Sequence, residues 1–110
     1  MGLRPRICYR FGVKLNAKQR QYLKGLAHAL SPVVRIGKSG LTDAVAGATA
    51  GALRAHELIK VRVDAEEAGE RREMAELLAG ETDAHLVGTV GKIAILYRAR
   101  DEDPGINLPK

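Results

Sequence analysis

A strand-forming run, a glycine-bounded turn, a helix and a second strand-forming run follow one another in this sequence, and they constrain the fold more than any other feature. Residues 33–36 are rich in β-branched side chains, and the turn GKSG occupies residues 37–40. A Thr-Asp pair at 42–43 can cap a helix. In residues 57–63 the side chains then alternate between two faces, one with Ile59, Val61 and Val63 and the other with Leu58, Lys60 and Arg62. Because a crossover helix returns the chain to the same end of a sheet, the two strands favour parallel pairing. The segment therefore predicts an α/β domain.

Helical periodicity flanks this unit on both sides. Residues 17–30 are predicted as the first helix, with Asn16 as its N-cap, and residues 64–79 as the third, with Gly80 as the residue that ends it. Apolar side chains recur at helical spacing in both segments, which predicts one face packed against a core. The residues expected on those faces are Tyr22, Leu23, Leu26 and Leu30 in the first helix and Met74, Leu77 and Leu78 in the third.

The C-terminal part of the pattern is a hairpin. Residues 85–98 read as two strands joined at Gly91-Lys92, where glycine in the first position of a two-residue turn is typical of type II′. The complete prediction is a compact single α/β domain of order α-β-α-β-α-β-β, in which three helices pack against a mixed four-stranded sheet.

Length and composition bound the domain organisation. The chain has 110 residues, 45% of them hydrophobic, which is enough for one domain with its own core. No apolar run approaches the roughly 18 residues of a membrane span. Residues 1–14 are expected to be a basic arm without the apolar core of a signal peptide, and residues 99–110 a flexible tail. The single Cys8 cannot form an internal disulfide and fits a reducing, cytoplasmic location.

Charge is segregated along the chain. Residues 1–42 hold nine of the eighteen Lys and Arg residues and none of the thirteen Asp and Glu residues. The part up to residue 42 therefore carries a net charge of +9 and the remainder −4. Such segregation predicts one surface that attracts a polyanion and another that repels it.

The turn at Gly37-Lys38-Ser39 has the ending of a nucleotide-binding P-loop, but the spacing excludes that motif. The first glycine of G-x-x-x-x-G-K-[ST] would fall at position 32, which is Pro32, a residue with a fixed φ and no N–H. What remains is a Gly-x-x-Gly loop, ending at Gly40, that opens a helix. Its N–H groups and the positive end of the helix dipole can face an anion such as phosphate.

Further basic residues lie outside the loop. Arg20, Lys24 and His28 are spaced to form a stripe on the first helix, opposite the predicted apolar side. In the strand 57–63, Lys60 and Arg62 fall on the face opposite the core, either outward or beneath a helix.

Four blocks of the sequence together resemble one known family. These blocks are LNAKQRQYLKGLAHALSPVVRIGKSGLT, AHELIKVRV, ERREMAELLAG and VGKIAILYR, which span residues 15–98 in the right order. They resemble the YhbY-like proteins, which consist of a single CRM domain (chloroplast RNA splicing and ribosome maturation). The resemblance implies an RNA-binding α/β fold similar to the C-terminal domain of translation initiation factor three. It also implies association with precursors of the large ribosomal subunit.

The resemblance carries over a set of RNA-binding residues, one position at a time. They are the loop residues Gly37, Lys38, Ser39 and Gly40, the first-helix residues Lys18, Arg20 and Lys24, and the turn residue Lys92. The sequence departs from the family pattern at Asn16-Ala17 and in a second helix that is poor in charge. Neither difference touches the loop.

The leading expectation is a monomeric, cytoplasmic, non-enzymatic protein whose partner is RNA, namely ribosomal RNA precursors of the large subunit. No catalytic set or metal-ligand spacing stands out, so no cofactor is expected. Aromatic residues are only 4% of the chain, so recognition is expected to depend on phosphate and shape, without DNA specificity. Two alternatives stay open, a protein-interaction adaptor with a basic surface and a small phosphate-ligand-binding enzyme.

Overall fold

The structure, a computed structural model, describes residues 15–99 and 105–106 and contains a mixed four-stranded sheet in this part of the chain. The expected basic arm, residues 1–14, lies outside the described residues. The strands are β1 (Pro32–Ile36), β2 (Leu58–Val63), β3 (His85–Val90) and β4 (Ile93–Tyr97), and the helices of the described residues are α2 (Ala17–Ala27), α3 (Asp43–His56) and α4 (Ala68–Glu81). The sheet order is β1-β2-β4-β3, with β1 and β2 parallel and the other pairs antiparallel. The predicted fold class and element order are confirmed.

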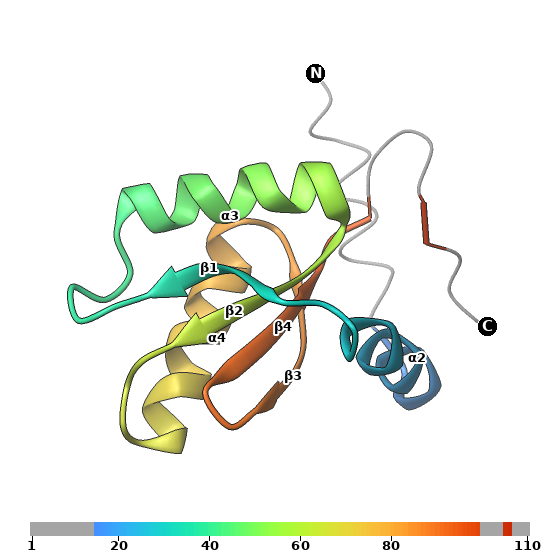
Figure 1. The fold of residues 1–110 in the computed structure, drawn as a ribbon, viewed down its shortest axis with the longest axis horizontal. Coiled ribbons are helices and arrows are strands. Elements are labelled where there is room, and N and C mark those ends of the chain that lie inside the picture. Colours follow the sequence, from blue (N-terminus) through green and yellow to red (C-terminus); the bar gives the residue numbers. More distant parts are fainter. Residues whose placement is uncertain (1–14, 100–104, 107–110) are drawn as a thin grey trace.

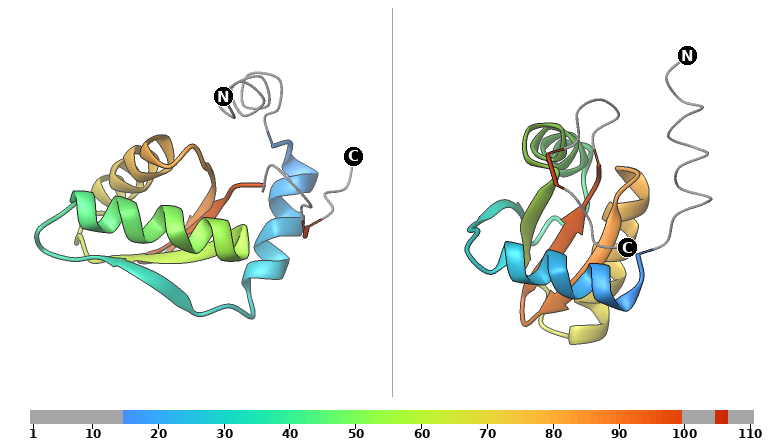
Figure 2. Two further views of the ribbon diagram at one scale, coloured as in Figure 1. Left: turned by 90° about the horizontal axis from the view of Figure 1, so that it is seen from above. Right: turned by 90° about the vertical axis from the view of Figure 1, so that its right-hand side faces the viewer.

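The helices lie on both faces of the sheet. Figures 1 and 2 show α3 and α4 together on one side and α2 at the opposite end of the molecule from the β1–α3 loop. The core beneath α3 and α4 includes Ile36, Leu53, Val61, Leu78 and Leu96. A second core beneath α2 comprises Leu15, Leu23, Ala27, Leu58, Val87, Ile95 and Tyr97. The sheet is therefore the central layer, but α2 covers only part of its second face.

The alternation predicted for residues 57–63 is confirmed in β2. Ile59, Val61 and Val63 face the core under α3 and α4, whereas Leu58 faces the core under α2. Arg62 shares the face of Leu58 but lies beyond the reach of α2, and its side chain is 48% exposed. Its register partner on β1, Arg35, is 68% exposed. One end of the second sheet face is thus uncovered and carries arginine.

Helix α2 begins as predicted and ends early. Asn16 Oδ1 accepts a hydrogen bond from the backbone N–H of Gln19 at 2.8 Å, and Gln19 Oε1 accepts one from the N–H of Asn16 at 3.1 Å, which together form a capping box. The helix ends at Ala27, three residues before the predicted end at residue 30.

The predicted apolar face of α2 is correct only at Leu23. Leu23 and Ala27 are fully buried, whereas Tyr22, Leu26 and Leu30 are each about 40% exposed. The physical reason is that α2 meets the sheet along the single line of Leu23 and Ala27, where the small alanine allows close approach. The flanking apolar residues fall beside that line.

Helix α4 starts at Ala68, four residues later than predicted, because the residues before it are held by other contacts. Asp64 bonds to two arginines, and the carbonyls of Ala65 and Glu66 accept hydrogen bonds from Arg71 Nη1 at 2.9 and 2.7 Å. These contacts fix residues 64–66 as a loop.

The end of α4 also differs from the prediction. Gly80 lies inside the helix, and the left-handed position that follows the C-cap is taken by Asp83, with φ 58°. The N–H of Ala84 donates to the carbonyl of Ala79 at 2.8 Å, as in a Schellman motif. Of the predicted core leucines, Leu78 is fully buried, but Leu77 is 58% exposed because it lies outside the contact that Ala75, Leu78 and Ala79 make.

A buried carboxylate joins the end of α3 to the chain that follows β4. Glu57 is 1% exposed and has a left-handed backbone, with φ 65°. Its carbonyl accepts from the N–H of Arg98 at 2.9 Å, and its Oε1 accepts from the N–H of Gly105 at 2.7 Å. Ile106 packs against the core beneath α2. Gly105 and Ile106 are the described part of the predicted tail after Ala99, and the rest lies outside the described residues.

Candidate nucleic-acid interface

The loop between β1 and α3 has two glycines that serve different purposes. The N–H of Gly40 donates to the carbonyl of Gly37 at 3.0 Å and closes the turn. Gly40 has φ 76°, a conformation that other residues adopt only with strain. A Cβ at Gly37, by contrast, would meet nothing within 4 Å, so packing does not require glycine there. Lys38 and Ser39 are exposed between them, and Thr42 Oγ1 caps α3 by accepting from the N–H of Val45 at 3.2 Å.

The loop forms one wall of an open groove of about 650 Å³ at the end of the sheet. Two backbone hydrogen bonds bring the walls together, from the N–H of Asp64 to the carbonyl of Ile36 at 3.1 Å and from the N–H of Val63 to the carbonyl of Lys92 at 2.7 Å. The groove is lined by Arg35, Gly37, Lys38, Arg62, Asp64, Glu66 and Lys92. It thus joins the loop to the β3–β4 turn and contains Gly37, Lys38 and Lys92 from the set of predicted residues.

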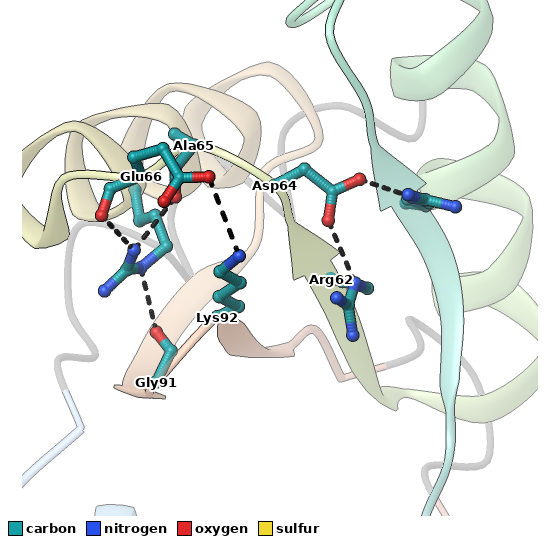
Figure 3. Close-up of polar contacts among 8 residues, drawn as sticks. Arg62, Asp64, Ala65, Glu66, Gly91 and Lys92 are labelled. Carbon is teal, nitrogen blue, oxygen red and sulfur yellow. Dashed lines mark hydrogen bonds and ion pairs between the residues drawn. The ribbon is translucent and has the colours of Figure 1, made fainter.

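Two arginines on neighbouring parallel strands share one carboxylate in this groove. Arg35 and Arg62 are register partners, and we call them the arginine pair. Asp64 accepts a hydrogen bond from Arg35 Nε at Oδ2 and another from Arg62 Nε at Oδ1, the second at 2.9 Å (Figure 3). These two hydrogen bonds, that from Arg35 first, hold the pKa of Asp64 below its ordinary value of 3.8. The carboxylate is therefore ionised at neutral pH and binds both guanidinium groups.

The turn wall of the groove is fixed by Arg71 of α4. Arg71 Nε donates to the carbonyl of Gly91 at 3.0 Å, while its Nη1 binds the carbonyls of residues 65 and 66 (Figure 3). Gly91 has φ 58° and Lys92 does not have a positive φ, which agrees with the predicted type II′ turn. The Nζ of Lys92 lies 4.0 Å from Glu66 Oε2, in a pair where the glutamate is 88% exposed. Such a pair is weak, so Lys92 can exchange Glu66 for another anion.

The basic residues of α2 form a separate group that lies over β3. Lys18 is exposed, and Arg20 Nη1 donates to the carbonyls of Leu86 and Val87 at 2.7 and 3.1 Å. The stem of Lys24 crosses Gly88, where an added Cβ would lie 2.6 Å from Lys24 Cε. In the part of the chain that the structure describes, no α2 residue lines the groove. The structure therefore divides the predicted residues into a groove group and an α2 group.

The sequence alone did not decide whether Arg62 belongs to the candidate interface, and it did not identify Arg35 or Asp64 as part of it. The signal for Arg35 was the alternation in β1, where Val34 and Ile36 are buried and Arg35 points to the other face. The sequence also left open whether Lys60 points outward or lies beneath a helix. Lys60 lies on the same face as Arg35, and its Nζ donates to the carbonyl of Leu30 at 3.0 Å. Asp64 could be placed only once the parallel register of β1 and β2 was known.

Within residues 15–99 and 105–106, no three His, Cys, Asp or Glu side chains are grouped so that they could hold a metal ion. The helices in the same part of the chain are all too short or too polar to span a bilayer.

The fold and the groove together define a small α/β domain with an open groove that four basic side chains, two carboxylates and Gly37 line. The model of the CRS1/YhbY (CRM) domain matches residues 15–98, and the chain belongs to that family. This confirms the resemblance drawn from the sequence blocks.

Similar proteins cover nearly the same length. A Haemophilus influenzae protein named "RNA-binding protein" is 47% identical over 100 residues, which are 87% of this chain and 96% of that one. Bacillus subtilis "Probable RNA-binding protein YqeI" is 37% identical over 86% of this chain and 99% of its own length. The solution structure of the hypothetical protein SAV1595 from Staphylococcus aureus has a TM-score of 0.78 and 35% identity, covering 87% of this chain and all of that one. The three descriptions read "RNA-binding protein", "Probable RNA-binding protein" and "a putative RNA binding protein", and none of them names an enzyme.

Proposed function

We propose that this protein binds RNA by its ribose-phosphate backbone in the groove between the β1–α3 loop and the β3–β4 turn. The observation that carries this proposal is the convergence of Lys38, Lys92 and the arginine pair on one open groove beside an unobstructed Gly37. The names of the relatives from H. influenzae and B. subtilis support RNA as the polyanion. Lys18 and Lys24 add a second area of phosphate contact over β3. Arg20 contributes mainly by holding α2 on the sheet through its two carbonyl contacts.

The target is a structured RNA, recognised by shape and phosphate. Stacking platforms use exposed aromatic side chains on a sheet, but Tyr97 is 1% exposed and stacks on His85 with ring centroids 6.3 Å apart. Among the described residues, no aromatic side chain lines the groove. On the family resemblance, the RNA is a precursor of large-subunit ribosomal RNA, bound in the cytoplasm by a monomer during subunit assembly, without DNA specificity. Crosslinking in cells followed by sequencing of the attached RNA tests this, and recovery of other RNAs in place of large-subunit ribosomal RNA would contradict it.

Lys38→Ala will weaken binding to a structured domain of large-subunit ribosomal RNA by about threefold to tenfold, because one phosphate contact is lost. The dependence of log Kd on log salt will flatten by about 0.7 to 0.9. Fluorescence anisotropy across a salt series measures both quantities.

Arg54→Ala, on the exposed side of α3, is the matched control and leaves both the affinity and its salt dependence nearly unchanged. Equal effects of the two variants would show that Lys38 contributes only net charge. Little RNA affinity at moderate salt would instead favour the adaptor alternative.

Gly37→Val and Gly40→Val will differ in their effect on the free energy of unfolding. Gly37→Val will leave the free energy of unfolding within about 0.5 kcal/mol of the wild type, because its Cβ would meet open space. It will nevertheless weaken RNA binding, because the side chain stands where the ribose-phosphate chain approaches. Gly40→Val will cost about 1–3 kcal/mol, because φ there is 76°. Chemical denaturation and RNA titration separate the two effects, and an unfolded Gly37→Val protein would show that this glycine is structural.

A further inference from the structure

Two carboxylates lie in the proposed RNA groove, where negative charge should repel phosphate. They differ in their surroundings. Glu66 is 88% exposed, and among the described residues its carboxylate has only the long 4.0 Å contact with Lys92. Asp64 is 16% exposed and binds both members of the arginine pair. On charge alone, neutralising either residue would strengthen RNA binding by a similar amount.

The contacts of Asp64 place the arginine pair in a defined arrangement. Arg35 and Arg62 sit side by side on adjacent parallel strands, where two like charges repel and two long side chains have many rotamers. One oxygen of Asp64 accepts from the Nε of each, and the backbone N–H of Asp64 is itself bound to the carbonyl of Ile36. Each guanidinium still has N–H donors on its two terminal nitrogens. The carboxylate thus holds two forked donor groups next to each other.

We propose that Asp64 is a positioning residue for RNA phosphate, so that this negative charge strengthens RNA binding by fixing Arg35 and Arg62 as a two-part phosphate clamp. The proposal rests on the proposed function and identifies its ligand group as backbone phosphate. The ordering of the two side chains before RNA arrives reduces the entropy that binding must otherwise remove. Fork-shaped guanidinium groups also match phosphate geometry better than ammonium groups do.

The test compares Asp64→Asn with Glu66→Gln, which remove one negative charge each from the same groove without changing side-chain size. We expect Glu66→Gln to tighten binding to a structured domain of large-subunit ribosomal RNA by about twofold or to leave it unchanged. We expect Asp64→Asn to weaken binding by about threefold to tenfold and to flatten the salt dependence by about one phosphate contact. Tighter binding by Asp64→Asn, in parallel with Glu66→Gln, would overturn the proposal.

Repeating the Asp64→Asn substitution in a protein that lacks the arginine pair separates its effect on RNA contacts from any effect on folding stability. In the Arg35→Ala/Arg62→Ala protein Asp64 has lost both arginine contacts, so Asp64→Asn there removes only a negative charge from the groove and should tighten RNA binding. A change of sign between the two backgrounds supports the positioning role, and the same sign in both overturns it. Thermal unfolding of every variant confirms that titrations are made below the unfolding transition. If the arginine pair and Lys38 prove dispensable for RNA binding, the proposed function fails; if they matter and the sign does not change, only the role of Asp64 fails.

Discussion

RNA affinity should fall by about 10- to 100-fold when Arg35 and Arg62 are both replaced by alanine, the largest loss expected from any pair in the groove. Two phosphate contacts disappear, and Asp64, which binds both arginines in the wild type, is left as a negative charge facing the RNA. The slope of log Kd against log salt should decrease by about 1.4 to 1.8. Titration of a structured ribosomal RNA domain by anisotropy, from about 50 to 200 mM salt, measures both changes.

A matched pair of arginines on the other side of the molecule provides the control. Arg54 on α3 and Arg72 on α4 are exposed, and these helices cover the sheet face opposite the arginine pair. Arg54→Ala/Arg72→Ala removes the same net charge, so a general electrostatic attraction would be weakened equally by both double variants. Equal losses would show that RNA is not bound preferentially in the groove.

Leu78→Ala should destabilise the domain by about 2–5 kcal/mol, because it removes a large side chain from the centre of the core beneath α3 and α4. Leu78 is fully buried between α4 and the sheet. A loss of this size is a large share of the stability of a small domain, which is about 5–15 kcal/mol. Urea denaturation followed by circular dichroism gives the change in the free energy of unfolding.

Replacement of the adjacent Leu77 by alanine is the control for Leu78→Ala, because it makes the same chemical change at an exposed position. Leu77 is 58% exposed, so Leu77→Ala should change the free energy of unfolding by only about 0.5 kcal/mol. The two variants have the same composition and lie on the same helix. Similar losses for both would mean that α4 packs on the sheet with a different face from the one described.

The order of helices and strands was predictable because each element carries its own period. In β2, the alternation from Ile59 onward was enough to assign Ile59, Val61 and Val63 to one core. The limits of α4 were not predictable, since they depend on partners distant in the sequence. Its start is displaced by the contacts of Asp64 and Arg71, and its end by a left-handed Asp83 where glycine is the usual choice.

The candidate site was predictable in its local parts only. The loop from Gly37 to Gly40 and the turn at Lys92 are recognisable from glycine placement, and the structure brings both to one groove. Arg35 could have been assigned to the outer face from the alternation in β1, but its pairing with Arg62 and the place of Asp64 depend on the parallel register between β1 and β2. The burial of α2 was also unpredictable, because periodicity does not reveal that a helix will cover only part of a sheet face.

The contact between Glu57 and Gly105 bears on where the folded unit stops. The family match ends at residue 98, yet a buried carboxylate at the end of α3 accepts a hydrogen bond from a residue well past that point. A chain cut at the last matched residue would lose this bond together with the apolar cover that Ile106 gives the second core. The homology boundary at residue 98 therefore leaves out contacts that Gly105 and Ile106 make with the folded domain.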